Sequence, residues 1–141
     1  MSSEAQEYID EMARSRGYVL NYHKVMAKQD FDVLKAANGL VSAAYLKQRT
    51  LDRKTKELIF ICSLTVLRAS KGHIQSHIRV ALESGATEQE ILEAIEIALP
   101  EAGIVAFQDG FEAWRELVGA EGLEPAVEVF DGATANATTT K

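Results

Sequence analysis

The chain has 141 residues and a formal net charge of −6, with 47% hydrophobic and 26% charged residues. This length suits one domain with a single core, and the composition is that of a soluble globular protein. The negative charge argues against a nucleic-acid partner, because phosphates would repel it. The single cysteine cannot form an internal disulfide, and neither an N-terminal signal nor an apolar run of ~20 residues points to a membrane, so we expect a cytoplasmic protein.

The first third of the chain predicts three helices. The first runs from about Glu4 to Arg16 and ends at Gly17. Asn21 is predicted to cap a short second helix. Asp30 is predicted to cap a longer third helix, whose apolar residues recur at spacings of three and four as far as Leu46.

The aromatic residues of this region are most simply core residues, although they could line an apolar substrate pocket; they are Tyr18, Tyr22, Phe31 and Tyr45. His23, on the short helix, is more simply an exposed or backbone-bonded side chain than a site residue. We keep Tyr22 and His23 as candidate substrate-binding residues.

The stretch from Leu51 to Gly85 carries the strongest chemical pattern. Asp52 is the predicted cap of a helix over residues 52–69 that is apolar around most of its circumference. Such a helix belongs in the centre of a bundle or at a subunit interface, so we expect a homo-oligomer. Cys62 lies inside the apolar block, where a buried small hydrophobe is more common than a nucleophile.

A second helix follows Ser70 and ends near Gly85. His73 and His77 begin it, and their spacing of four places both side chains on one face. The pair could cap the turn, act as acid and base, or contribute to a metal site. Two histidines supply only two ligands and no HExxH sequence is present, so we expect no bound metal.

The remaining pattern is also helical. Thr87 and Glu90 form a predicted capping box for a helix that ends or kinks at Pro100, and a last helix runs to Gly119. No segment alternates as a strand would. We therefore predict an all-α bundle of about six helices, followed by a partly disordered tail over residues 121–141.

Residues 51–117 resemble the carboxymuconolactone decarboxylase and AhpD-like superfamily. The shared features are a charged helix opening, a long apolar helix, a break, His77, a helix ending at Gly85, and a restart at Thr87. The resemblance implies one AhpD-like helical domain over residues 1–120, assembled as a trimer or hexamer with its pocket near a subunit contact.

This family has two branches, and the chain departs from both. The peroxidase-reductase branch carries a CxxC pair where this chain has Ser70 and His73, whereas its histidine corresponds to His77 and its glutamate lies within one residue of Glu57. A disulfide cycle needs two thiols, so redox chemistry is disfavoured. The decarboxylase branch has a glutamate where His73 stands, a histidine at His77, and a further histidine near Ile97.

The resemblance therefore implies a lyase that acts on a small carboxylated lactone or keto acid without a metal or organic cofactor. His77 would donate a proton to the carbanion or enolate, with His73 and Glu57 as the other catalytic candidates. Arg68 and Lys71 could hold the anionic substrate. The alternatives are an AhpD-like peroxidase or oxidoreductase, and a non-catalytic oligomeric protein that binds a small molecule.

Overall fold

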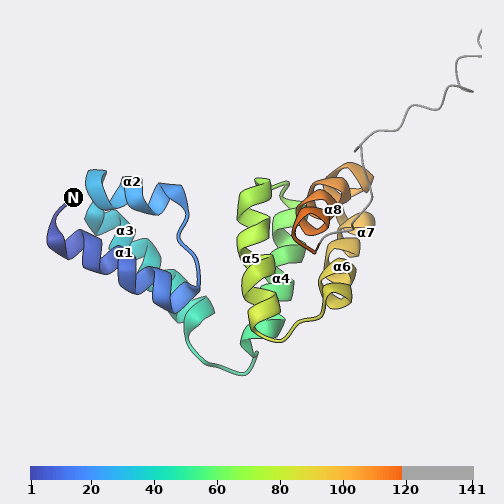
Figure 1. Ribbon diagram of the computed structural model, residues 1–141, viewed down its shortest axis with the longest axis horizontal. Helices are drawn as coiled ribbons and strands as arrows, with labels where there is room; N and C mark the ends of the chain where they lie inside the picture. The colour runs from blue at the N-terminus through green and yellow to red at the C-terminus, as the bar shows by residue number, and fades with distance from the viewer. Residues whose placement is uncertain (119–141) are drawn as a thin grey trace, which may run out of the picture.

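A computed structural model describes residues 1–118, and every regular element in that part of the chain is a helix (Figure 1). The elements in chain order are α1 (Ser3–Arg16), α2 (Asn21–Gln29), α3 (Phe31–Val41), the π-helical turn η1 (Ser42–Leu46), α4 (Arg53–Val66), α5 (Lys71–Glu83), α6 (Glu88–Glu96), α7 (Ala98–Ala102) and α8 (Ile104–Val118). The predicted all-α class is confirmed. The expected tail over residues 121–141 lies outside the described residues, as does the predicted domain end at residue 120.

The helices form two groups, each with its own apolar core. Figure 1 shows α1 to α3 on one side and α4 to α8 on the other. The core of the first group consists of Ala5, Ile9, Met12, Ala27 and Leu34. Each group buries its own apolar residues, so polar side chains can occupy the boundary between the two groups. This boundary between α1 to α3 and α4 to α8 is called the seam below.

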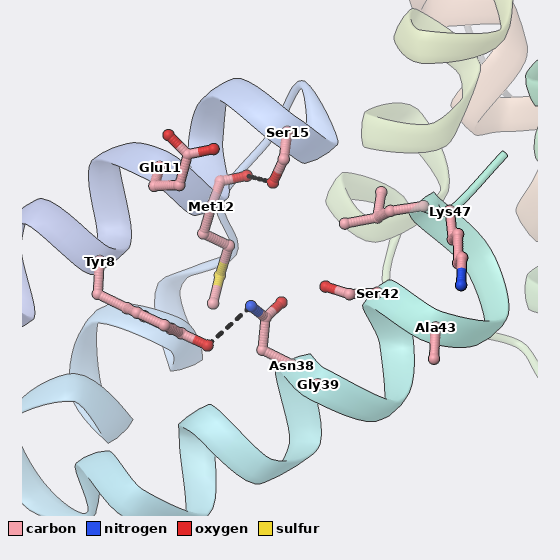
Figure 2. A pocket seen from close by; sticks show the side chains of 10 residues that line it. Tyr8, Glu11, Met12, Ser15, Asn38, Gly39, Ser42, Ala43 and Lys47 are labelled. Carbon is pink, nitrogen blue, oxygen red and sulfur yellow. Dashed lines mark hydrogen bonds between the residues drawn. The ribbon is translucent and has the colours of Figure 1, made fainter.

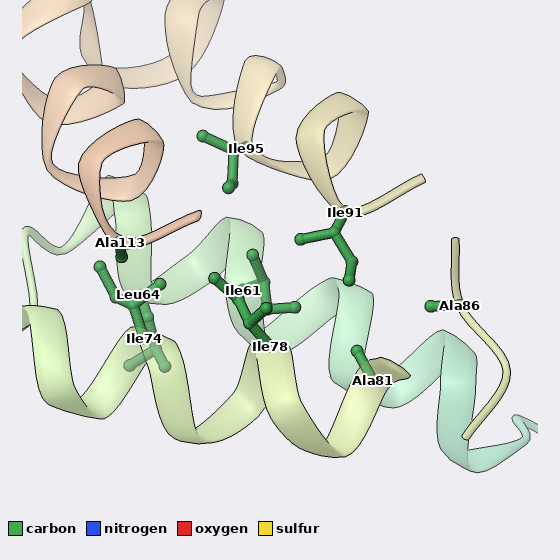
Figure 3. Close-up of a cluster of buried hydrophobic side chains, with 9 residues drawn as sticks. All are labelled: Ile61, Leu64, Ile74, Ile78, Ala81, Ala86, Ile91, Ile95 and Ala113. Atoms are coloured by element: carbon green, nitrogen blue, oxygen red, sulfur yellow. The ribbon is translucent and has the colours of Figure 1, made fainter. Parts of the chain in front are cut away.

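The core of the second group joins four helices (Figure 3). Ile61 and Leu64 of α4 pack on α5, and residues of α6 and α8 complete the cluster; the others are Ile74, Ile78, Ala81, Ala86, Ile91, Ile95 and Ala113. Gly110 allows α8 to approach closely, because a Cβ atom there would collide with Thr65 and with Ile95. This packing fixes α4 and α5 side by side.

The start of α2 differs from the prediction. Leu20, not Asn21, occupies the N-cap position, and Asn21 is already the first helical residue. The side chain of His23 takes over the capping role, since its Nδ1 accepts a hydrogen bond from the Leu20 backbone N–H at 3.0 Å. The prediction that Asn21 caps this helix was therefore wrong. Because His23 bonds to the Leu20 N–H, its side chain is buried rather than exposed.

The apolar block of α4 is only partly covered within one chain. α4 ends at Val66, earlier than predicted, because Arg68 adopts a left-handed conformation with φ of 55°. Ile59 is 51% exposed and Leu67 is 75% exposed. Further exposed apolar residues lie on α7 and α8, namely Leu99, Ile104 and Val105. None of the described helices has the length and apolar character needed to cross a membrane.

Candidate functional site

Two fully buried polar residues face each other across α4 and α5. Glu57 lies near the beginning of α4 and His77 near the middle of α5, and neither is exposed to solvent. His77 Nδ1 lies 2.6 Å from Glu57 Oε2. The antiparallel course of the two helices brings together residues 20 positions apart.

The second carboxylate oxygen of Glu57 is also engaged. Arg53, one helical turn earlier, donates from Nε to Glu57 Oε1 at 2.7 Å, and the hydroxyl of Tyr45 donates to the same oxygen. Arg53 also donates from Nη2 to Tyr45 Oη at 3.0 Å and to the backbone carbonyl of Arg16 at 2.6 Å. The guanidinium thereby ties the end of α1 to α4.

These contacts determine the roles of the ring nitrogens of His77. Burial raises the pKa of Glu57, and the contact with His77 opposes that rise. Oε1 accepts from Arg53 and from Tyr45, and the positive charge of Arg53 favours the ionised carboxylate, which can only accept hydrogen bonds. His77 Nδ1 is consequently the donor, and Nε2 points away from Glu57.

Tyr18 completes a chain of three groups at the seam. Its hydroxyl lies 3.3 Å from His77 Nε2. Burial raises the pKa of Tyr18, while the charge of Arg16 partly counteracts this effect, so the phenol keeps its proton at neutral pH. The ring of Phe60 stacks on the imidazole of His77 at a centroid distance of 4.6 Å and an interplanar angle of 8°. The imidazole is thus held in one orientation.

His73 lies beside this chain of groups. Its ring centre is 5.4 Å from that of His77, and it is only half-buried. Burial lowers the pKa of His73, and the proximity of His77 lowers it further, so His73 is neutral at neutral pH. Its position at the start of α5 follows from Ser70, whose side chain caps the helix by accepting from the His73 N–H at 3.4 Å.

The structure does not bring Arg68 and Lys71 to Glu57 and His77. Both are exposed and pair with acids of α8: Arg68 with Asp109 at 3.2 Å and Lys71 with Glu116 at 2.7 Å. Tyr22 is 57% exposed, and its ring lies 4.1 Å from that of His23.

A second pair of buried polar residues lies on the N-terminal side of the seam. Arg16 and His23 are 5% and 1% exposed. Arg16 donates from Nη2 to the side-chain oxygen of Asn38. Burial lowers the pKa of His23 to about 4, and the charges of Arg16 and His73 act in the same direction.

Two cavities lie close to residues that take part in these contacts. One of about 580 Å³ lies between α1 and the end of α3 with η1 (Figure 2). There Asn38 donates to Tyr8 Oη at 2.8 Å and also accepts from Arg16, so it connects this cavity to the seam. The other cavity, of about 190 Å³, is lined partly by Tyr45 and Phe60, whose rings contact His77.

The thiol chemistry of the peroxidase-reductase branch has no counterpart among the described residues near His77. Ser70 serves as a helix cap, and Cys62 is a half-buried thiol whose pKa is raised by burial, which disfavours the nucleophilic thiolate. Within residues 1–118, no group of three or more histidine, cysteine, aspartate or glutamate side chains is placed to hold a metal ion.

Sequence patterns missed three members of the site. Tyr18 and Tyr45 were noted only as aromatic residues that could line a pocket, and Arg53 only as part of a charged helix opening. The spacing of four between Arg53 and Glu57 was a usable signal for their ion pair. Tyr18 lies in the connection between α1 and α2 and Tyr45 lies in η1, so only the tertiary fold could reveal their hydroxyl contacts.

Comparison with known proteins identifies the family. No curated protein is similar enough to the chain to be matched. A model of the carboxymuconolactone decarboxylase family matches residues 32–116, which is more than half of the chain. The matched segment contains Glu57 and His77, whereas Tyr18 precedes it. With its buried glutamate–histidine pair between two packed helices, this chain belongs to the carboxymuconolactone decarboxylase family.

Proposed function

We propose that this protein is a lyase that removes carbon dioxide from a small carboxylated lactone or keto acid, with His77 as the proton source. The observation that carries the proposal is the chain of contacts from Glu57 through His77 to Tyr18. A buried carboxylate that fixes one nitrogen of an imidazole leaves the other nitrogen available for proton transfer.

The chemistry begins when the bond to the substrate carboxylate breaks. Carbon dioxide leaves, and the bonding electron pair passes into the conjugated carbonyl group to form an enolate. No metal or organic cofactor is part of this proposal, because the carbonyl group itself accepts the electrons.

The enolate carbon then takes a proton from the hydroxyl of Tyr18. In its protonated state His77 donates with both nitrogens, so its Nε2–H replaces the proton that Tyr18 has given up. Glu57 stabilises the imidazolium before the transfer through Nδ1. One proton from water restores His77, and half-buried His73 provides the nearby carrier. The net reaction consumes one proton for each carbon dioxide released.

The test is carbon dioxide release with product identification from a panel of small unsaturated lactone acids and keto acids. We expect His77→Ala to lower kcat by at least about a hundredfold, since a positioned general acid commonly contributes that much. Tyr18→Phe is expected to lower kcat as well, because it keeps the ring and removes only the transferring hydroxyl. Arg79→Ala, at an exposed position of the same helix as His77, serves as the matched control.

Two results would count against this function. Turnover that His77→Ala leaves unchanged would place the chemistry elsewhere. Saturable binding of the same acids by the wild type, without carbon dioxide release, would instead support a non-catalytic binding protein.

A further inference from the structure

Two buried donors at the seam have no acceptor among the described residues. They are Arg16 Nε and His23 Nε2. Both side chains are more than nine-tenths buried. A buried donor without an acceptor costs free energy, and native proteins seldom leave one unmatched, so a partner from outside the protein chain is expected at this point.

The hydrogen bonding of His23 determines which proton is available. Its Nδ1 accepts from the Leu20 backbone N–H, so that nitrogen carries no proton. The neutral ring must then carry its proton on Nε2, which is the nitrogen without a partner. His23 therefore offers one fixed N–H donor rather than an acceptor.

The charge of Arg16 points to the same kind of partner. No carboxylate of the described residues lies within salt-bridge distance of its guanidinium. Its side-chain partners are neutral groups, the amide of Asn38 and the hydroxyl of Tyr18. Arg53 and Glu57 already pair with each other nearby. The buried positive charge of Arg16 is thus left without a counter-ion, and an anionic oxygen would supply one.

The location connects these donors to the proposed reaction. Arg16 ends α1 and is separated from Tyr18 by Gly17 alone, and a hydrogen bond with Arg16 is among the influences that lower the pKa of Tyr18. The backbone N–H that holds His23 belongs to Leu20, two residues after Tyr18. The two free donors therefore lie beside the outer end of the Glu57–His77–Tyr18 chain, where a substrate would receive its proton.

We propose that Arg16 and His23 together bind an anionic oxygen of the substrate next to Tyr18. The inference rests on the proposed function for the identity of the ligand, a small carboxylate that carries a carbonyl group. The oxygen belongs either to a carboxylate that stays on the substrate or to the enolate that forms as carbon dioxide leaves. Both residues precede the segment matched by the family model, so this binding site is contributed by the N-terminal helices of this chain.

The first experiment needs no turnover. Laevulinate carries both a carboxylate and a ketone carbonyl group. It is titrated into protein with isotope-labelled histidine, and the NMR signal of the His23 Nε2–H is followed. Laevulinamide, which lacks the negative charge, is the matched ligand control. We expect laevulinate to shift this signal in the wild type, and the amide to shift it far less.

Variants then measure how much Arg16 and His23 each contribute to laevulinate binding. We expect Arg16→Gln and His23→Phe each to weaken laevulinate binding by at least about tenfold, the usual effect of losing a charge-assisted hydrogen bond. Arg14→Gln, an exposed arginine of the same helix that pairs with Glu11, is expected to bind as the wild type does. The wild-type titration remains decisive if a variant fails to fold.

Kinetics distinguish the two sources of the oxygen. A fall in kcat in the two variants identifies the enolate oxygen as the group that Arg16 and His23 bind, because such an interaction strengthens in the transition state. A rise in KM alone assigns a carboxylate that stays on the substrate.

The inference and the proposed function can fail separately. If turnover depends on His77 but the two variants bind and react as the wild type does, and laevulinate leaves the His23 signal unmoved, a buried water satisfies these donors and the inference is overturned. If laevulinate binds through Arg16 and His23 but no acid of the panel releases carbon dioxide, the binding site stands and the lyase function falls.

Discussion

Lowering the pH from 6.5 towards 4 is expected to destabilise the fold through His23. In the unfolded chain this side chain has the ordinary histidine pKa of 6.5, whereas burial in the folded chain lowers the pKa to about 4. Between these values the unfolded state binds the proton and the folded state does not. The stability that His23 contributes is therefore complete above pH 6.5 and is lost as the pH falls through the folded pKa.

The difference between the two pKa values gives the size of the effect. It corresponds to a loss of about 3 kcal/mol in the free energy of unfolding over this pH range. The charges of Arg16 and His73 near His23 are part of the cause, so protonation of His73 at low pH adds to the loss. His73 itself has a lowered pKa and contributes in the same direction.

The measurement is urea unfolding of the wild type and His23→Gln at a series of pH values across this range. Glutamine can still accept from the Leu20 N–H but does not titrate, so the variant is expected to lose much less stability as the pH falls. Parallel curves for the two proteins would show that His23 is protonated equally in both states, and the burial argument would then be refuted.

Three further expectations concern the buried carboxylate, a helix crossing and the exposed apolar face. Glu57→Gln is expected to lower the free energy of unfolding by about 3 kcal/mol, because Arg53 loses its counter-ion inside the protein; an unchanged urea midpoint would contradict this. Gly110→Ala is expected to lower the melting temperature, because the added Cβ atom forces α8 away from Thr65. Gly39 lies inside α3 with open space beside it, so Gly39→Ala is expected to raise the free energy of unfolding by about 0.5–1 kcal/mol. We also propose that exposed apolar residues, among them Ile59, Leu67 and Ile104, join copies of the chain into a trimer or hexamer. Light scattering on the wild type and Ile59→Glu is the test, and a wild-type mass of 15.5 kDa would reject it.

The helices could be predicted because local signals determine them. Apolar spacing and caps such as Asp52 and the Thr87–Glu90 box act within a few residues, and the structure has both caps where the sequence placed them. Asn21 failed as a cap because a competing side chain, His23, satisfies the same backbone group from inside the helix.

The site was less accessible to sequence reasoning because its contacts are long-range. Glu57 and His77 could be proposed from the family resemblance. The contact between Tyr18 and His77 joins residues 59 positions apart and depends on how the N-terminal helices pack against α5. The acids of α8 that pair with Arg68 and Lys71 could not be identified from the sequence either, so the prediction that these two residues hold the substrate did not include those ion pairs.

The segment matched by the family model and the 31 residues before it supply different parts of the proposed chemistry. The segment matched by the family model contains Glu57 and His77, which hold and move the proton. The residues before it bring Tyr18, Arg16 and His23 to the outer end of that pair. Gly17 fixes their position, because its left-handed conformation ends α1 against Val80 of α5. If the proposed site is correct, substrate preference in this chain is determined mainly by its first 31 residues, and replacing them would change the substrate while leaving the Glu57–His77 pair in place.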